Sequence, residues 1–73
     1  MLDFGWALDM LRAGRYVSRE GWNGPDQYLF LQEPDKDSLM TLPYVAIVTV
    51  AGDTVPWLAS QTDLLATDWF EVV

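Results

Sequence analysis

Cysteine and histidine are both missing from this chain, and only four of its residues are basic. Without thiols the protein cannot form disulfides, and without either residue type a zinc site is nearly excluded. Histidine and cysteine are also the side chains that most often act as general base or nucleophile at neutral pH. The sequence therefore favours a protein that binds rather than an enzyme, and we expect it to need no cofactor and no metal.

Long apolar runs are missing as well. No stretch approaches the roughly 20 residues of a membrane-spanning helix, and the first residues lack the basic and apolar regions of a signal peptide. Eleven acidic residues give the chain a formal net charge of −7. This charge opposes the phosphate neutralisation on which nucleic-acid binding depends. We therefore expect a cytosolic protein that binds neither DNA nor RNA and does not associate with a membrane.

Hydrophobic residues, in contrast, make up 51% of the 73 residues and include four tryptophans. A chain of this length forms a single domain, here residues 1–73, and buries only about 60% of its unfolded surface. One small core cannot hide so much apolar surface, and neither disulfides nor a metal can reinforce it. We therefore expect a homo-oligomer, in which a second apolar stripe of the N-terminal helix (Trp6, Met10 and Ala13) contacts a neighbouring subunit.

The pattern of polar and apolar residues predicts an α+β fold. Asp3 is placed to cap a helix that begins at Phe4, and Gly14 is placed to end it. Ser60 and Asp63 have the spacing of a capping box, which predicts a second, short helix. Strand character is found in residues 15–19, 27–32, 44–50, 55–57 and 68–73. We expect the N-terminal helix to pack on an antiparallel sheet of about four strands, with the short helix before the last strand.

Two of these strands are expected at the edges of the sheet. The segment Arg15–Arg19 is short and alternates in polarity, which is typical of an edge strand. Pro56 cannot donate a hydrogen bond to a neighbouring strand, so the segment around it is expected at an edge or at the end of pairing.

The stretch "REGWNG", residues 19–24, places Trp22 and Asn23 in a tight turn between two glycines. The indole either fills the core or offers a flat surface for stacking, and core packing is the more common role of a single aromatic. Arg19 follows Arg12 and Arg15, so the segment before the turn is locally positive and is a candidate for holding a phosphate. Further aromatic and polar groups that could contact a ligand are Tyr28, Tyr44, Trp57, Ser60, Gln61, Thr62 and Asp63.

Three segments carry a resemblance to a known family: "FGWALDMLRAGRYVSREGWNG", "YLFLQ" and "VPWLASQTDLLATDW". In this order, over residues 4–72, they resemble the Thoeris anti-defence protein 2 family of small phage proteins. Members of that family are homotetramers that sequester cyclic ADP-ribose isomers made by bacterial Toll/interleukin-receptor proteins, and some also hold cyclic oligonucleotides in separate pockets. The resemblance implies that this chain binds such nucleotides in the bacterial host cytoplasm without cleaving them.

The same resemblance implies that residues 22–24 and 60–63 line the ligand site. We expect Trp22 to stack on the adenine, Asn23 to bond a polar edge, and Arg19 to contact a phosphate, with ribose contacts from residues 60–63. The candidate ligand-binding residues are Arg19, Trp22, Asn23, Gly24, Tyr28, Trp57, Ser60, Gln61, Thr62 and Asp63. Ala59 stands where the family pattern has proline, so the loop before the second helix is expected to be looser.

A second function fits the same composition. A small acidic oligomer with a net charge of −7 could block a host defence enzyme directly, as a protein–protein inhibitor. The acidic residues are dispersed rather than arranged in runs, however, and the turns are rich in aromatic and amide groups. These features favour the nucleotide-binding interpretation.

Overall fold

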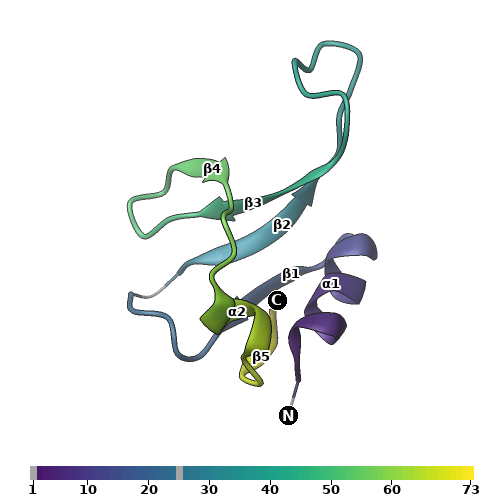
Figure 1. The fold of residues 1–73 in the computed structure, drawn as a ribbon. Coiled ribbons are helices and arrows are strands. Elements are labelled where there is room, and N and C mark those ends of the chain that lie inside the picture. The colour runs from purple at the N-terminus through teal and green to yellow at the C-terminus, as the bar shows by residue number, and fades with distance from the viewer. Residues whose placement is uncertain (1, 25) are drawn as a thin grey trace.

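The computed structural model describes residues 2–24 and 26–73 and has the predicted α+β architecture (Figure 1). Two helices accompany one five-stranded sheet, in which all neighbouring strands are antiparallel and follow the order β4-β3-β2-β1-β5. The elements are α1 (Phe4–Arg12), β1 (Tyr16–Arg19), β2 (Tyr28–Gln32), β3 (Tyr44–Val48), β4 (Thr54–Pro56), α2 (Gln61–Leu65) and β5 (Trp69–Val72). The N-terminal helix and the short helix before the last strand are both confirmed.

The ends of the helices follow from local chemistry. The Asp3 carboxylate accepts a hydrogen bond from Trp6 N at 2.9 Å, and Gly14 follows α1 with a φ of 83°, which glycine adopts at little cost. At α2, Ser60 Oγ accepts from Asp63 N at 3.0 Å, and Asp63 Oδ2 accepts from Ser60 N at 3.2 Å. Both predicted caps are confirmed. Neither helix in the described residues has the length and apolar character needed to cross a membrane.

The prediction that Arg15–Arg19 forms an edge strand is wrong. β1 lies between β2 and β5, and β5 pairs with every residue of β1. Adjacent residues Val17 and Ser18 are both buried, although they point to opposite faces of the sheet. The partner strand comes from the far end of the chain, and the polarity of β1 alone does not reveal it.

The other edge prediction is confirmed, because β4 with Pro56 is an outer strand of the sheet. The sheet has one strand more than the expected number of about four, since Thr54–Pro56 pairs with β3. β3 ends at Val48, before the predicted end at Val50. There the chain turns, and Thr49 N donates a hydrogen bond to Asp53 O at 2.8 Å.

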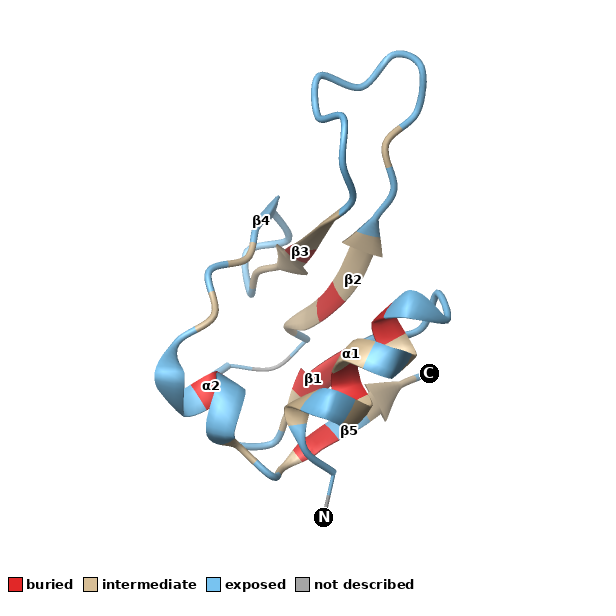
Figure 2. Ribbon diagram, turned by 45° about the vertical axis from the view of Figure 1, so that its right-hand side comes forward, coloured by how far each residue is buried: buried red, intermediate tan, exposed pale blue. Residues whose placement is uncertain are grey.

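The core lies between α1 and one face of the sheet, where the helix contacts β1, β2 and β5 (Figure 2). The buried core consists of Ala7, Leu11, Val17, Leu29 and Trp69. Trp6 and Met10 also pack against this core, so the chain itself partly covers the second apolar stripe of α1. The second stripe is therefore not reserved for contact with a neighbouring subunit, because part of it packs within the same chain.

The face of the sheet opposite α1 carries aromatic side chains. Because side chains alternate along a strand, this face receives Tyr16, Tyr28, Phe30 and Phe70, which we call the open face. The Tyr16 ring lies 5.2 Å from the Tyr28 ring and 6.3 Å from the Phe30 ring. Tyr16 is 48% exposed and Phe70 is 38% exposed. The fold thus leaves considerable aromatic surface in contact with solvent.

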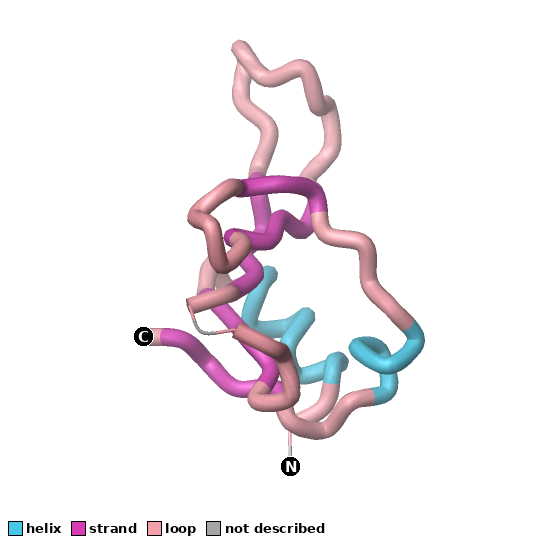
Figure 3. Tube along the Cα trace, turned by 90° about the vertical axis from the view of Figure 1, so that its left-hand side faces the viewer, coloured by secondary structure: helices cyan, strands magenta, loops and turns pink. Residues whose placement is uncertain are grey.

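Residues 33–43 form an extended loop between β2 and β3 that reaches away from the rest of the molecule (Figures 1 and 3). Its hydrogen bonds are local: Asp37 N donates to Asp35 Oδ1 at 2.9 Å, and Met40 N donates to Ser38 Oγ at 3.2 Å. Leu39 in this loop is 98% exposed. The extended loop is therefore held by short-range contacts.

Candidate functional site

The two sequence blocks that predict the ligand site lie side by side. The turn after β1 is joined through its backbone to the residue that precedes β5. Glu20 N donates a hydrogen bond to Asp68 O at 3.2 Å, and Gly21 N donates to Asp68 Oδ2 at 2.7 Å. Residues 19–24 and 60–69 therefore form one unit, which we call the anchored end.

Asp63 is the centre of this unit, and its side chain is among the few buried polar groups of the described chain. The residue is 8% exposed. Its Oδ1 accepts hydrogen bonds from Arg19 Nη1 at 2.7 Å and from Trp22 Nε1 at 2.9 Å. Its Oδ2 accepts from Ser60 N, and its backbone carbonyl accepts from Trp69 Nε1 at 3.2 Å. A single residue thus fixes two indole rings and one guanidinium.

The Arg19 side chain is only 12% exposed and pairs with two carboxylates. Its Nε lies 2.8 Å from Asp68 Oδ1, and its Nη1 lies 2.7 Å from Asp63 Oδ1. The hydrogen bond to Asp68 raises the pKa of Arg19, burial opposes this, and the bond to Asp63 adds to it. Three of the five N–H donors of the guanidinium are used, which leaves two for a ligand. The positive charge, however, is already balanced within the chain.

The two carboxylates that pair with Arg19 have a lowered pKa. Burial raises the pKa of Asp63, but the hydrogen bonds from Trp22 and Arg19 outweigh burial. The hydrogen bond from Arg19 is the main cause of the lowered pKa of Asp68, with burial opposing it. Both groups are therefore ionised at neutral pH. Among the described residues, no three potential metal-ligating side chains come together.

Trp22 belongs to a cluster of aromatic rings at the edge of the core. Its ring meets the Trp69 ring edge-to-face with centroids 5.5 Å apart, and it lies 6.5 Å from the Trp57 ring. Trp57 in turn lies 6.1 Å from Trp69 and 5.8 Å from Phe4. These contacts give Trp22 and Trp57 the packing role that was the alternative to ligand stacking, although both side chains remain partly exposed.

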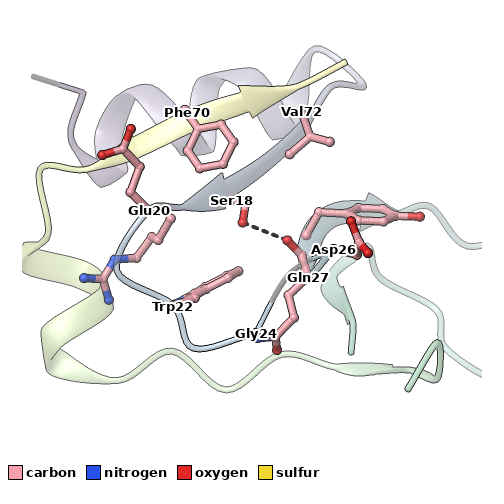
Figure 4. Close-up of a pocket in the computed structure, with 10 residues that line it drawn as sticks. Ser18, Glu20, Trp22, Gly24, Asp26, Gln27, Phe70 and Val72 are labelled. Atoms are coloured by element: carbon pink, nitrogen blue, oxygen red, sulfur yellow. Dashed lines mark hydrogen bonds between the residues drawn. The ribbon is translucent and has the colours of Figure 1, made fainter. Parts of the chain in front are cut away.

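A hollow of about 650 Å³ opens beside Trp22. It lies over β1, β5 and the start of β2, and the turn after β1 forms its other wall (Figure 4). The lining residues are Ser18, Arg19, Glu20, Trp22, Gly24, Asp26, Gln27, Tyr28, Phe70 and Val72. Four of the predicted ligand-binding residues therefore share this hollow: Arg19, Trp22, Gly24 and Tyr28.

The wall formed by the turn depends on two local features. Gly24 has a φ of 100°, and a Cβ there would lie 2.6 Å from Val50 Cγ2, so only glycine fits. Ser18 Oγ donates a hydrogen bond to Gln27 O at 2.7 Å, which holds the returning end of the turn against β1 (Figure 4). Pro25, which follows Gly24 in the sequence, lies outside the described residues.

The other predicted residues do not line the hollow of this chain. Gln61 and Thr62 are exposed in the first turn of α2, whereas Trp57 packs in the aromatic cluster. Asn23 is exposed, and its carbonyl accepts a hydrogen bond from Gln27 Nε2 at 2.7 Å. Ser60 serves the helix cap. Their contacts with a ligand stay a prediction.

Sequence reasoning missed Phe70 and Val72 as lining residues. The signal was present, because β5 alternates and Trp69 and Glu71 point away from the face that carries Phe70 and Val72. Gln27 and Ser18 were missed as well, since nothing in the local sequence shows that they meet.

The charges around the hollow limit what it can hold. Its walls include the exposed carboxylates of Glu20 and Asp26, while its one guanidinium is already paired. The three aromatic lining residues, Trp22, Tyr28 and Phe70, instead suit a flat ring. Stacking of a base on an aromatic face contributes about 1–3 kcal/mol per base and is possible for every base. The hollow therefore suits a flat, uncharged ring better than a phosphate group.

Comparison with known proteins yields two similarities. The family described as the Thoeris anti-defense 2-like domain matches residues 2–72. The chain is also similar to the protein "Thoeris anti-defense 2" of Bacillus phage SP01, with 35% identity over 81 residues. This similarity covers 93% of the present chain and 91% of the phage protein. Both blocks of the anchored end fall inside the matched region.

Proposed function

Because the chain belongs to the Thoeris anti-defense 2-like family, we propose that this anti-defence protein sequesters cyclic ADP-ribose-type signalling nucleotides. It acts in the cytoplasm of the bacterial host and leaves every bond of the ligand intact. Removal of the free messenger prevents the defence effector from being activated. Cyclic oligonucleotides are a second ligand class within the same proposal.

The hollow beside Trp22 is the observation that carries this proposal. Its volume of about 650 Å³ lies within the usual range of small-molecule sites, about 300–1,000 Å³. Aromatic side chains from the turn after β1, from β2 and from β5 line a space that could hold one base, with the Gln27 amide close by. The proposed contacts there are stacking on Trp22 and Tyr28 and hydrogen bonds to the two free N–H groups of Arg19.

A protein that sequesters a messenger must hold it tightly. Micromolar to nanomolar affinity corresponds to about −8 to −12 kcal/mol, which requires burial on several sides. The hollow of a single chain is open, and the exposed Tyr16 and the half-buried Phe30 continue beyond it. We propose that a second copy closes the hollow and that the protein is a homotetramer.

This assembly also accounts for the predicted residues that lie outside the hollow. Gln61 and Thr62 are exposed on α2 and have no side-chain hydrogen bond among the described residues that would occupy them. In the proposed assembly, residues 60–62, Asn23 and Trp57 of a neighbouring subunit contact the ligand. The phosphates then lie away from the carboxylates of Glu20 and Asp26.

A release experiment tests the proposal. The protein is incubated with cyclic ADP-ribose isomers, freed of unbound ligand and denatured by heat, and the supernatant is analysed by mass spectrometry. We expect the intact nucleotide to be released by the native protein and by the loop variant Leu39→Ala, but not by Trp22→Ala. Chemically altered nucleotide would indicate an enzyme, and an empty supernatant for all proteins would refute sequestration.

One observation favours the alternative of an acidic protein–protein inhibitor. The extended loop presents Leu39 and Leu42 to solvent beside several acidic residues, which suits insertion into an apolar site on a host enzyme. In the same experiment, an inhibitor would release no nucleotide and would form a stable complex with a defence enzyme. That complex would be lost in Leu39→Ala and kept in Trp22→Ala.

A further inference from the structure

The orientation of Trp22 depends on one polar contact. The residue lies in a turn, and its backbone N makes a hydrogen bond of 3.3 Å to Arg19 O. The indole has a single polar hydrogen, and Nε1 donates it to Asp63 Oδ1 at 2.9 Å. The ring is thereby held edge-to-face against Trp69 while it also forms a wall of the hollow.

Asp63 is itself rigidly placed. Its backbone N and its Oδ2 are both engaged with Ser60 in the capping box of α2. Its carbonyl accepts the hydrogen bond of the Trp69 indole, so the residue is also tied to the core. The carboxylate that receives the Trp22 indole therefore has little freedom to move.

We propose that Asp63 is a positioning residue for the hollow, which holds the Trp22 indole at the angle required for ligand stacking. Asp63 does not line the hollow, so it acts through Trp22 rather than on the ligand. The part of this inference that concerns ligand binding rests on the proposed function. The part that concerns the orientation of the indole does not.

Asp68 provides a matched control. Like Asp63, it pairs with Arg19, and the loss of either carboxylate removes one negative charge from a net charge of −7. Unlike Asp63, it bonds the backbone of Gly21 and makes no hydrogen bond with the indole of Trp22 in the described chain. Both variants lose a pairing with Arg19, whereas Asp63→Ala alone loses the indole contact and, in addition, the capping bond from Ser60 N.

The orientation is tested without any ligand. In 15N-labelled protein, the indole N–H signal of Trp22, assigned by its absence in Trp22→Phe, reports the bond to Asp63. We expect Asp63→Ala to shift this signal and to speed its hydrogen exchange at least tenfold, whereas Asp68→Ala leaves both within twofold. An unchanged indole signal in Asp63→Ala would overturn the inference.

Binding is tested by calorimetry with cyclic ADP-ribose. We expect Asp63→Ala and Trp22→Phe each to weaken binding about tenfold or more, and the double variant to lose little beyond either single one, because both remove the same contact. Asp68→Ala should stay within threefold of the native affinity. Equal losses in Asp63→Ala and Asp68→Ala, or losses that add in the double variant, would overturn the positioning role.

Asp63→Asn keeps the test decisive if Asp63→Ala does not fold. Its Oδ1 can still accept the indole hydrogen bond, but the charge opposite Arg19 is gone. We expect the native indole signal and an affinity within threefold of native, and a larger loss would overturn the positioning role by assigning the effect to the charge opposite Arg19 or to the lost capping bond from Ser60 N. Failure of the native protein to bind cyclic ADP-ribose would refute the proposed function alone, and the indole signal would then decide the inference.

Discussion

The anchored end and the extended loop show two ways in which this small chain organises its turns. In the anchored end, residues 19–24 are bonded to residues 60–69, which are distant in sequence. In the extended loop, the described hydrogen bonds join residues only a few positions apart. Long-range contacts therefore concentrate where the candidate site lies, and the loop at the other end of β2 is coupled only weakly to the fold.

The largest change in the free energy of unfolding is expected from a substitution of Trp69, whose ring packs the anchored end against the core. Trp69 is 2% exposed and contacts three other aromatic rings. Trp69→Ala should lower the free energy of unfolding by about 3–5 kcal/mol, because it leaves a cavity and frees an acceptor on Asp63. Urea unfolding followed by circular dichroism measures this, and a loss below about 1 kcal/mol would mean that the anchored end adds little to the core.

A slightly smaller effect is expected from the ion pairs. Arg19→Ala leaves two carboxylates facing each other without a counter-charge and should cost about 3 kcal/mol. Arg19→Lys should recover only part of this, since an ammonium group cannot bond both carboxylates in a fork. Full recovery in the lysine variant, measured by the same urea unfolding, would show that charge rather than geometry holds the two blocks together.

Acid should weaken the anchored end. The pKa values of Asp63 and Asp68 are lowered in the folded chain, so their contribution to stability is present above the unfolded value and is lost as the pH falls below about 4. The loss should be smaller than in Arg19→Ala, because a protonated carboxyl group still accepts hydrogen bonds. Urea midpoints measured from pH 7 to pH 3 should fall in the native protein and much less in Asp63→Asn/Asp68→Asn.

The smallest effect is expected in the extended loop. Leu39→Ser removes a side chain that is almost wholly exposed and should change the free energy of unfolding by less than about 0.5 kcal/mol. The measurement is the same urea titration, at several protein concentrations. A loss that appears only at high concentration would mean that the loop is covered in an assembly, and the contrast between the two regions would then hold only for the isolated chain.

The sequence predicted correctly those features that depend only on neighbouring residues. The caps at Asp3 and Ser60, the end of α1 at Gly14 and the outer position of Pro56 each follow from one or two neighbouring residues. The resemblance also identified the two blocks that meet in the anchored end. These predictions required no knowledge of which strands pair.

The sequence did not predict those features that depend on contacts between residues far apart in the chain. The interior position of β1 depends on β5, and the hollow depends on Phe70 meeting the turn after β1. The two carboxylates that pair with Arg19 also come from the end of the chain and were not foreseen, and its contact with a phosphate stays a prediction. The identity of a residue shows which bonds it can make, whereas the fold decides which partner takes them.

The sole lysine, Lys36, sits in the extended loop, at the opposite end of β2 from the hollow. An amine-reactive fluorophore will therefore attach, apart from the α-amine, at one defined point outside the hollow. Trp22 is one of four tryptophans that can act as energy donors to such a dye, and it lies in the turn before β2, whereas the dye lies in the loop after β2. Energy transfer between them can follow ligand entry and subunit assembly in real time without altering a residue of the site.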